Sequence, residues 1–336
     1  MIWLFLLLAA ATSPQPGQLK TFKDWIVGCD NGRVCHATSL MPEDGDWEQQ
    51  LGLSIERGAE SRAEPAITLL AEGGKEYLLR TVRGQIVRVV ARSSVPDYRI
   101  DPRDLPIVIA ALRTDSGLGV ETGGKRVGDI SLAGVSAALL HMDDQQKRIG
   151  DPSAFIRPRN RPASTVPPPP PLPVIRSAAR KVAKPFAIPP ATIAALRKRF
   201  ECEPEEPDWP GYDATEEALD PGHVLLLLGC GAGAYNYSSV AIVATKRGNR
   251  IDAAAARYDF SPNWGEGQPM LVNAEWDAEH GLLTSFAKGR GLGDCGTFAD
   301  YAWDGQRFRL VERREMDECR GSIDYITTWR AKVVRN

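Results

Sequence analysis

Six cysteines have the most clearly defined chemistry in this 336-residue chain. They fall into three pairs that are close in sequence: Cys29 with Cys35, Cys202 with Cys230, and Cys295 with Cys319. Paired thiols persist as disulfides in an oxidising compartment, and an even number of cysteines fits a closed set of bonds. Other pairings are possible, but the local pairs keep each bond inside one folding unit. We therefore predict three structural disulfides between these partners.

The sequence supports a metal site or a catalytic site less than it supports the disulfides. A Cys-x-x-Cys pair, a common start of a zinc site, is absent, and the four histidines are scattered: His36, His141, His223 and His280. There is no Gly-x-Ser-x-Gly nucleophile motif. Acidic pairs such as Asp143-Asp144 lie in polar stretches that are typical of solvated surfaces. The sequence thus predicts no catalytic residue, no cofactor and no metal site, although distant residues could still assemble a triad.

A glycine-rich run at residues 289–296 has the composition of a phosphate-binding loop. Backbone N–H groups in such a loop can cradle an anion. Phosphate loops lead into a helix, however, and residues 297–303 have the pattern of a strand. We interpret the run as a structural turn.

Aromatic side chains supply the candidate binding surface. Four tryptophans lie in predicted strands and are expected in the core: Trp25, Trp276, Trp303 and Trp329. Four other aromatic residues stand in or beside polar segments that contain proline or glycine: Trp209, Trp264, Tyr235 and Tyr237. We predict that this second group forms an exposed surface that contacts a protein or a glycan.

The chain divides into a leader and two predicted domains around a linker. Residues 1–16 are predicted to be a signal peptide, because a short apolar run is followed by small residues and is too short to span a membrane. An N-terminal β-sandwich-like domain is expected over residues 17–155 and a C-terminal β-meander over 186–336. Residues 156–185 form a linker rich in proline and arginine, which favours a stiff, extended spacer.

Short predicted strands separated by glycine and proline dominate both domains, so the expected fold class is mostly β (all-β or α+β), with antiparallel sheets. Each domain should also contain one short helix, the first within 132–142 and starting near Asp129 or Ser131, the second over 190–200. The predicted strands are 24–28, 34–40, 50–56, 66–71, 76–82, 85–91, 223–228, 237–245, 270–276, 282–287, 297–303, 307–311 and 325–333.

The distribution of charge restricts the class of partner. A net charge of −2 argues against a dedicated nucleic-acid-binding protein. The linker region is different, because the stretch from Lys147 to Lys184 contains many basic residues and only one acidic residue, Asp151. These cations keep the linker solvated, and a sharper hypothesis is that they contact an anionic envelope surface.

Two sets of motifs resemble known families. The segment from Phe22 to Cys35, the glycine-rich run with Cys295, the stretch from Trp303 to Phe308 and Cys319-Arg320-Gly321 resemble the DUF1176 family of exported bacterial proteins. This resemblance implies six cysteines, a place in the Gram-negative envelope and no assigned activity. The segment from Asp24 to Cys29, with residues 131–139, is similar to invasion-associated locus B proteins, which implies an all-β fold with an interaction role.

These observations favour an interaction or binding module in the periplasm or outside the cell, stapled by disulfides and without a transmembrane span. Its expected partner is an envelope protein or a glycan. Two alternatives remain: a structural or stress-protective envelope protein, and a hydrolase that acts on the cell wall.

Overall fold

The computed structural model describes residues 13–43, 51–91, 98–180, 185–204, 210–262 and 268–335. Strands predominate over helices among these residues, and all strand pairs but one are antiparallel, so the predicted mostly-β fold is confirmed. None of the helices in this part of the chain is long and apolar enough to cross a membrane. Residues 1–12 of the predicted signal peptide lie outside the described residues.

Two antiparallel sheets form the N-terminal half. The first has the order β1-β2-β3-β4-β5: Lys20–Phe22, Trp25–Cys29, Cys35–Ser39, Gly52–Arg57 and Pro65–Leu70. The second has the order β7-β6-β8-β9: Ile86–Val90, Glu76–Arg80, Gly117–Thr122 and Lys125–Ser131. Apolar side chains of both sheets and of helices α1 (Leu105–Thr114) and α2 (Val135–Gln145) share one buried core.

The helices of this half differ from the single helix predicted. Helix α1 was not predicted, although Pro106 near its start and buried Leu105, Val108 and Leu112 follow helical spacing. Helix α2 begins after Gly134 instead of near Asp129 or Ser131, because those two residues belong to β9. Gly134 has a φ of 95°, and a Cβ there would lie 1.7 Å from the carbonyl oxygen of Phe22. Only glycine fits this close approach.

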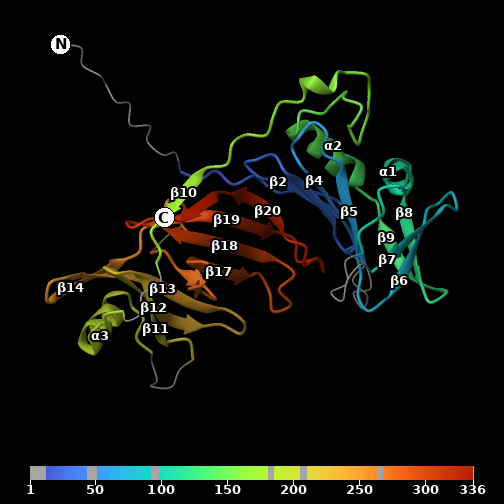
Figure 1. Cartoon of the computed structure of the whole chain (residues 1–336). Helices are drawn as coiled ribbons and strands as arrows, with labels where there is room; N and C mark the ends of the chain where they lie inside the picture. Colours follow the sequence, from blue (N-terminus) through green and yellow to red (C-terminus); the bar gives the residue numbers. More distant parts are fainter. Residues whose placement is uncertain are drawn as a thin grey trace, which may run out of the picture.

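The C-terminal half contains two further sheets, a short strand pair and the predicted helix α3 (Pro190–Arg199). One sheet has the order β11-β12-β13-β14, with β15 also paired to β13: Ala214–Asp220, His223–Ala232, Tyr237–Arg247, Arg250–Ala255 and Leu271–Val272. The other has the order β16-β17-β18-β19-β20: Glu275–Asp277, Leu282–Lys288, Gly296–Trp303, Phe308–Met316 and Ile326–Arg330. Figure 1 shows this second sheet between the first and the N-terminal half.

Strand β12 accounts for the apolar run at residues 224–228. Leu225 and Leu227 point into the core shared with the β16–β20 sheet, whereas Val224, Leu226 and Leu228 pack on the side of α3. A strand that is covered on both faces needs apolar residues at every position. The four tryptophans expected in the core are buried as predicted: Trp25, Trp276, Trp303 and Trp329.

Two predicted strands are interrupted. The strand expected over residues 270–276 is divided into β15 and β16 at Asn273, which has a φ of 46°. The strand expected over 325–333 is divided into β20 and β21 (Lys332–Arg335). Strands β1, β8, β9, β11 and β14 were not predicted.

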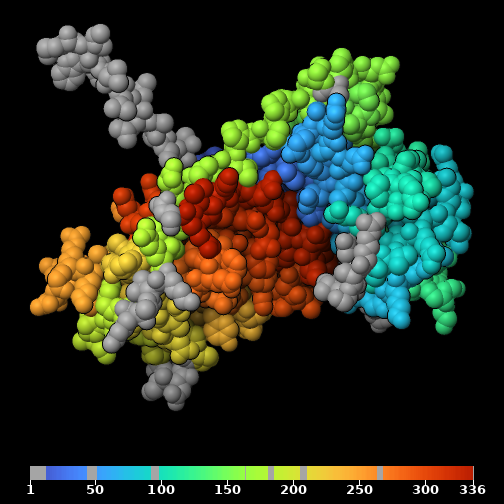
Figure 2. Space-filling view, in the orientation of Figure 1, coloured from blue at the N-terminus to red at the C-terminus, as the bar shows by residue number. Residues whose placement is uncertain are grey.

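Part of the predicted linker is regular structure. Residues Ala163–Thr165 form a short 3-10 helix, and Val174–Ser177 form β10, which pairs in parallel with β21. The guanidinium of Arg33 donates hydrogen bonds to the carbonyl oxygens of Pro167, at 3.3 Å, and Pro168. In Figure 2 the green linker accordingly lies along the surface of both halves.

Candidate functional site

The three disulfides join the cysteine pairs predicted from the sequence. Cys29–Cys35 closes the β2–β3 hairpin, Cys202–Cys230 fastens the end of α3 to β12, and Cys295–Cys319 ties the glycine-rich run to the segment before β20. All six cysteines belong to the described residues, and none is free. Their sulfur atoms therefore hold structure and are not available for thiol chemistry.

Two of the four residues of the predicted binding surface are described, and they lie together. Tyr235 and Tyr237 are in the β12–β13 hairpin, with 37% and 54% of their surface exposed. Leu292, in the glycine-rich run, is 71% exposed. The hydroxyl of Tyr235 donates to the carbonyl oxygen of Gly289, and its ring lies against Gly291. We call Tyr235, Tyr237 and Leu292 the Tyr–Leu surface; Trp209 and Trp264 lie outside the described residues.

The hairpin that carries the two tyrosines is fixed by a pair of asparagines. The amide of Asn236 donates to the carbonyl oxygen of Lys288 at 2.9 Å. Asn273 donates to Asn236 at 3.0 Å and to the carbonyl oxygen of Phe286 at 2.9 Å, and it accepts the N–H of Tyr237. These contacts hold the hairpin against the end of β17.

The glycine-rich run is held from several sides. Asp294 is buried, pairs with Arg290, and accepts the N–H of Gly321 at 2.7 Å. The hydroxyl of Tyr325 donates to the carbonyl oxygen of Gly293, and burial, with the charge of Asp294, raises the pKa of Tyr325 to about 12. The carboxylate of Asp294 thus binds the guanidinium of Arg290 and the backbone N–H of Gly321. Both groups are engaged within the protein, as expected of a structural turn. The run leads into strand β18, as predicted.

Arg320 connects this loop to the N-terminal half. Its side chain is buried and donates to the carbonyl oxygens of Met41 and Lys23, each at 2.8 Å, and to the carboxylate of Asp24 at 2.5 Å. Asp24 also accepts the hydroxyl of Ser131. The linker is therefore not the only connection between the two halves.

The contacts of Arg320 form a junction between the N-terminal and C-terminal halves. Further contacts extend this junction along β20. Arg330 pairs with Asp30 and exchanges two hydrogen bonds with the side chain of Asn31. Five buried apolar residues from both halves fill the space between: Ile26, Leu40, Cys295, Met316 and Ile326. Figure 1 shows β2 beside β20, as these contacts require.

One histidine at the junction has the partners of a catalytic triad but not its geometry. Nε2 of His36 lies 2.8 Å from Ser54 Oγ and 2.8 Å from Asp324 Oδ2. In a hydrolase triad, the imidazole contacts serine through one nitrogen and the carboxylate through the other. Here one nitrogen makes both contacts, so Asp324 does not orient the ring through its other nitrogen as a triad carboxylate does.

His36 and Asp324 instead form an ion pair across the junction. Burial lowers the pKa of His36, but the hydrogen bond and charge of Asp324, with Glu56, outweigh it and place this pKa above its usual 6.5. Burial likewise raises the pKa of Asp324, but its contacts with His36, Ser54 and Thr38 hold it below 3.8. Asp220 and Asp277 also pair with histidines, each with one three residues further along a turn.

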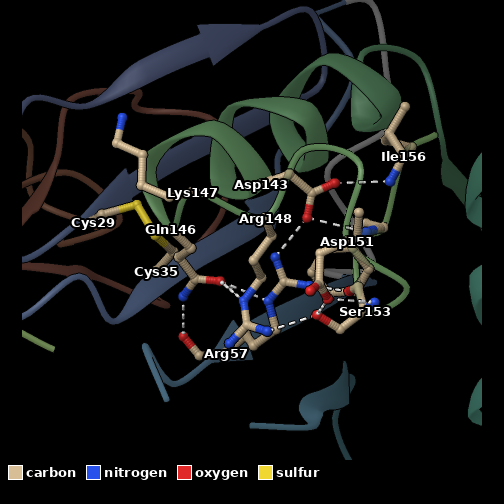
Figure 3. A network of polar contacts seen from close by, with 12 residues as sticks. Cys29, Cys35, Arg57, Asp143, Gln146, Lys147, Arg148, Asp151, Ser153 and Ile156 are labelled. Carbon is tan, nitrogen blue, oxygen red and sulfur yellow. Dashed lines mark hydrogen bonds and ion pairs between the residues drawn. A yellow bond between two sulfur atoms is a disulfide. The ribbon is translucent and has the colours of Figure 1, made fainter. Parts of the chain in front are cut away.

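A buried polar network fastens α2 to the first sheet (Figure 3). Asp143 and Arg57 form an ion pair at 2.6 Å, and both are almost fully buried. Gln146 accepts from Arg57 and from Arg148, and Arg148 also donates to the hydroxyl of Ser153. Burial lowers the pKa of Arg57 to about 10. The positive charges of Arg57 and Arg148 are matched by the negative charges of Asp143 and Asp151. The network therefore has no net charge that would attract a charged ligand.

An apolar cavity of about 270 Å³ lies beside the junction. It is lined mainly by the ends of β4 and β5 and by residues 321–323, and its larger side chains are Met41, Leu51, Leu70, Tyr98 and Ile323. Its volume is at the lower end of the range for small-molecule sites.

Sequence reasoning identified the two tyrosines but missed Leu292 and the junction. The glycine-rich run was interpreted only as a turn, yet an isolated leucine among glycines and charges is a sign of exposure. Arg320, Asp24 and Asp324 carry no local signal, because the hydrogen bonds that join them to the other half connect residues 279 to 297 positions apart in the chain.

Comparisons with known proteins agree with the family resemblance. The family described as protein of unknown function (DUF1176) matches residues 19–332, and the chain belongs to that family. The uncharacterized protein YpfG of Escherichia coli (strain K12) is 29% identical over 343 residues, a match that covers 95% of this chain and 94% of that protein. No solved structure matches the chain.

Proposed function

We propose that this protein is an exported envelope protein that binds a partner through the Tyr–Leu surface. The observation that carries the proposal is the exposure of Leu292 and Tyr237 on segments fixed by a disulfide, an ion pair and side-chain hydrogen bonds. Exposed apolar side chains on a rigid support lose little conformational entropy on binding. Tyrosine is also enriched among the residues that dominate interface energies.

A protein partner fits this surface better than a glycan does. Leu292 is the most exposed of the three residues and has no polar group to bond sugar hydroxyls. An exposed leucine on a loop that packs against Tyr235 suits an apolar pocket on another protein, which removes its surface from water. Tyr237 can donate a hydrogen bond at the edge of the same contact.

The test compares partner capture by two double variants of the full chain. Tyr237→Ala with Leu292→Ala should reduce recovery of a stoichiometric partner from envelope extract at least about ten-fold, with little change in melting temperature. The control is Val174→Ala with Ile323→Ala, which removes apolar side chains of similar exposure elsewhere. Equal recovery by both variants would reject the surface.

Export is part of the proposal. The apolar leader, the three disulfides and the family support it. Cell fractionation should place the mature, disulfide-bonded chain in the periplasm or the medium. Reduced full-length protein in the cytoplasm of unstressed cells would contradict it.

The basic linker adds a second, weaker contact to the proposal. Arg157, Arg159, Arg176 and Arg180 are exposed and face no acid within the linker. Attraction to an anionic envelope surface should be lost in roughly 0.5 M salt, where charges are screened over a few ångströms. Binding to anionic vesicles that is absent in low salt, or that survives high salt, would argue against it.

A further inference from the structure

Strand β7 is a terminal strand with exposed apolar side chains. It lies at one end of the β7-β6-β8-β9 sheet, at the right of Figure 1. Ile86 and Val90 are 48% and 46% exposed, and Val82 in the preceding turn is 67% exposed. Native proteins normally protect such edges, because unpaired backbone groups can recruit another strand.

The register of β6 and β7 shows which backbone groups are free. Hydrogen bonds from Thr81 N–H to the Gln85 carbonyl and from Ala91 N–H to the Lys75 carbonyl flank the ladder. Bonded and non-bonded pairs alternate in an antiparallel ladder, so Val87 and Val89 bond to β6. The N–H and C=O groups of Ile86, Arg88 and Val90 therefore point away from β6. No other strand of the described residues pairs with this side.

The side chains of the same three residues form one outer row, because alternate residues share a face of a strand. Arg88, between the two apolar residues, is 68% exposed and pairs with Glu76. Two copies that paired antiparallel about Arg88 would place the two guanidiniums opposite each other, which is unfavourable. The row of Ile86, Arg88 and Val90 thus disfavours pairing with β7 of a second copy. It favours pairing with a strand that carries an acidic residue between two apolar residues.

We propose that the free edge of β7 accepts an extended segment of another protein, which adds a strand to this sheet. Main-chain hydrogen bonds to Ile86, Arg88 and Val90 supply the binding, as in other cases of strand addition. A carboxylate opposite Arg88 and apolar side chains opposite Ile86 and Val90 supply the selectivity. This edge is separate from the Tyr–Leu surface and does not depend on it.

The test uses the full chain and two capped heptapeptides. One has the sequence Thr-Val-Thr-Glu-Thr-Val-Thr, and the other has Lys in place of Glu. Amide hydrogen exchange should slow at Ile86, Arg88 and Val90 when the Glu peptide is added, while Val87 and Val89 remain protected throughout. The Lys peptide should bind more weakly.

Two variants of one residue separate the backbone from the side chain. Arg88→Pro removes an N–H that points away from β6 and leaves the ladder to β6 intact, so affinity for the Glu peptide should fall about ten-fold. Arg88→Ala keeps the N–H and should bind both peptides alike. Tyr237→Ala should change neither result.

Several outcomes would overturn the proposal. These are unchanged exchange with peptide, equal binding of the Glu and Lys peptides to the wild type, and protection of β7 that rises with protein concentration alone. If Arg88→Pro lowers the melting temperature, the loss of discrimination in Arg88→Ala decides the question.

Discussion

Asp143 is the residue on which the packing of α2 most directly depends. Its carboxylate accepts the guanidinium of Arg57 and the backbone N–H groups of Phe155 and Ile156, all in a space closed to water. A buried ion pair adds little net stability over an apolar pair of the same shape, but removing one partner leaves the other charged and unpaired. The network therefore fixes one arrangement of α2 and makes its loss costly.

We expect Asp143→Asn to lower the free energy of unfolding by roughly 3 kcal/mol or more, because Arg57 would remain buried without its counter-charge. Urea unfolding measures this change. The matched control is Asp129→Asn, which breaks the exposed pair with Arg126 and should lower the free energy of unfolding much less. Equal losses in the two variants would mean that burial does not determine the effect.

At the scale of elements, the glycine-rich loop presents Leu292 because the disulfide of Cys295 restrains its end and the ion pair of Arg290 with Asp294 ties its start to that end. Cys295–Cys319 and Cys202–Cys230 close similar lengths of chain, 24 and 28 residues. The chain-entropy contribution to stability should therefore be similar, whereas only the first bond holds the loop that carries Leu292. The second bond holds β12, in the hairpin that carries the two tyrosines.

This pair of bonds gives a controlled prediction. Replacing Cys295 and Cys319 by Ser should lower stability by about 2–4 kcal/mol and weaken partner binding, because the loop loses its restraint. Replacing Cys202 and Cys230 by Ser should lower stability by a similar amount and weaken binding less, because the loop of Leu292 keeps its own disulfide. Calorimetry and the capture assay provide the two measurements. Equal loss of binding in both variants would show that stability alone is responsible.

At the scale of the whole molecule, the two halves are joined through charged pairs that respond to pH. The pKa of His36 is raised when folded, so its contribution to stability is full below pH 6.5 and is lost as pH rises through the folded pKa. The pKa of Asp324 is lowered, so its contribution is present above pH 3.8 and is lost as pH falls further. The pair should stabilise the junction most between these values.

We therefore expect His36→Gln to reduce the free energy of unfolding most between about pH 4 and 6.5, and progressively less as pH rises above that range. Chemical unfolding of both proteins across this range gives the difference directly. A difference that does not vary with pH would mean that the junction does not depend on the charge of His36.

The parts of this molecule that were predicted correctly are those with a local pattern. Alternation and turn residues located most strands, including β12. Local spacing also gave the three disulfides. The junction was not predictable in this way, because Arg320 and Asp24 are 296 residues apart in the chain. Leu292 became a candidate for the binding surface only when the structure placed its loop against Tyr235.

The proposed binding function depends on whether Leu292 contacts a partner in the cell. Site-specific photocrosslinking measures this most directly, with a photoreactive amino acid in place of Leu292 and, as a control, of Val174, which is 59% exposed on β10. We predict a discrete protein adduct from position 292 that is lost when Tyr237→Ala is also present. Adducts that are absent at position 292, or the same at position 174, would contradict the account.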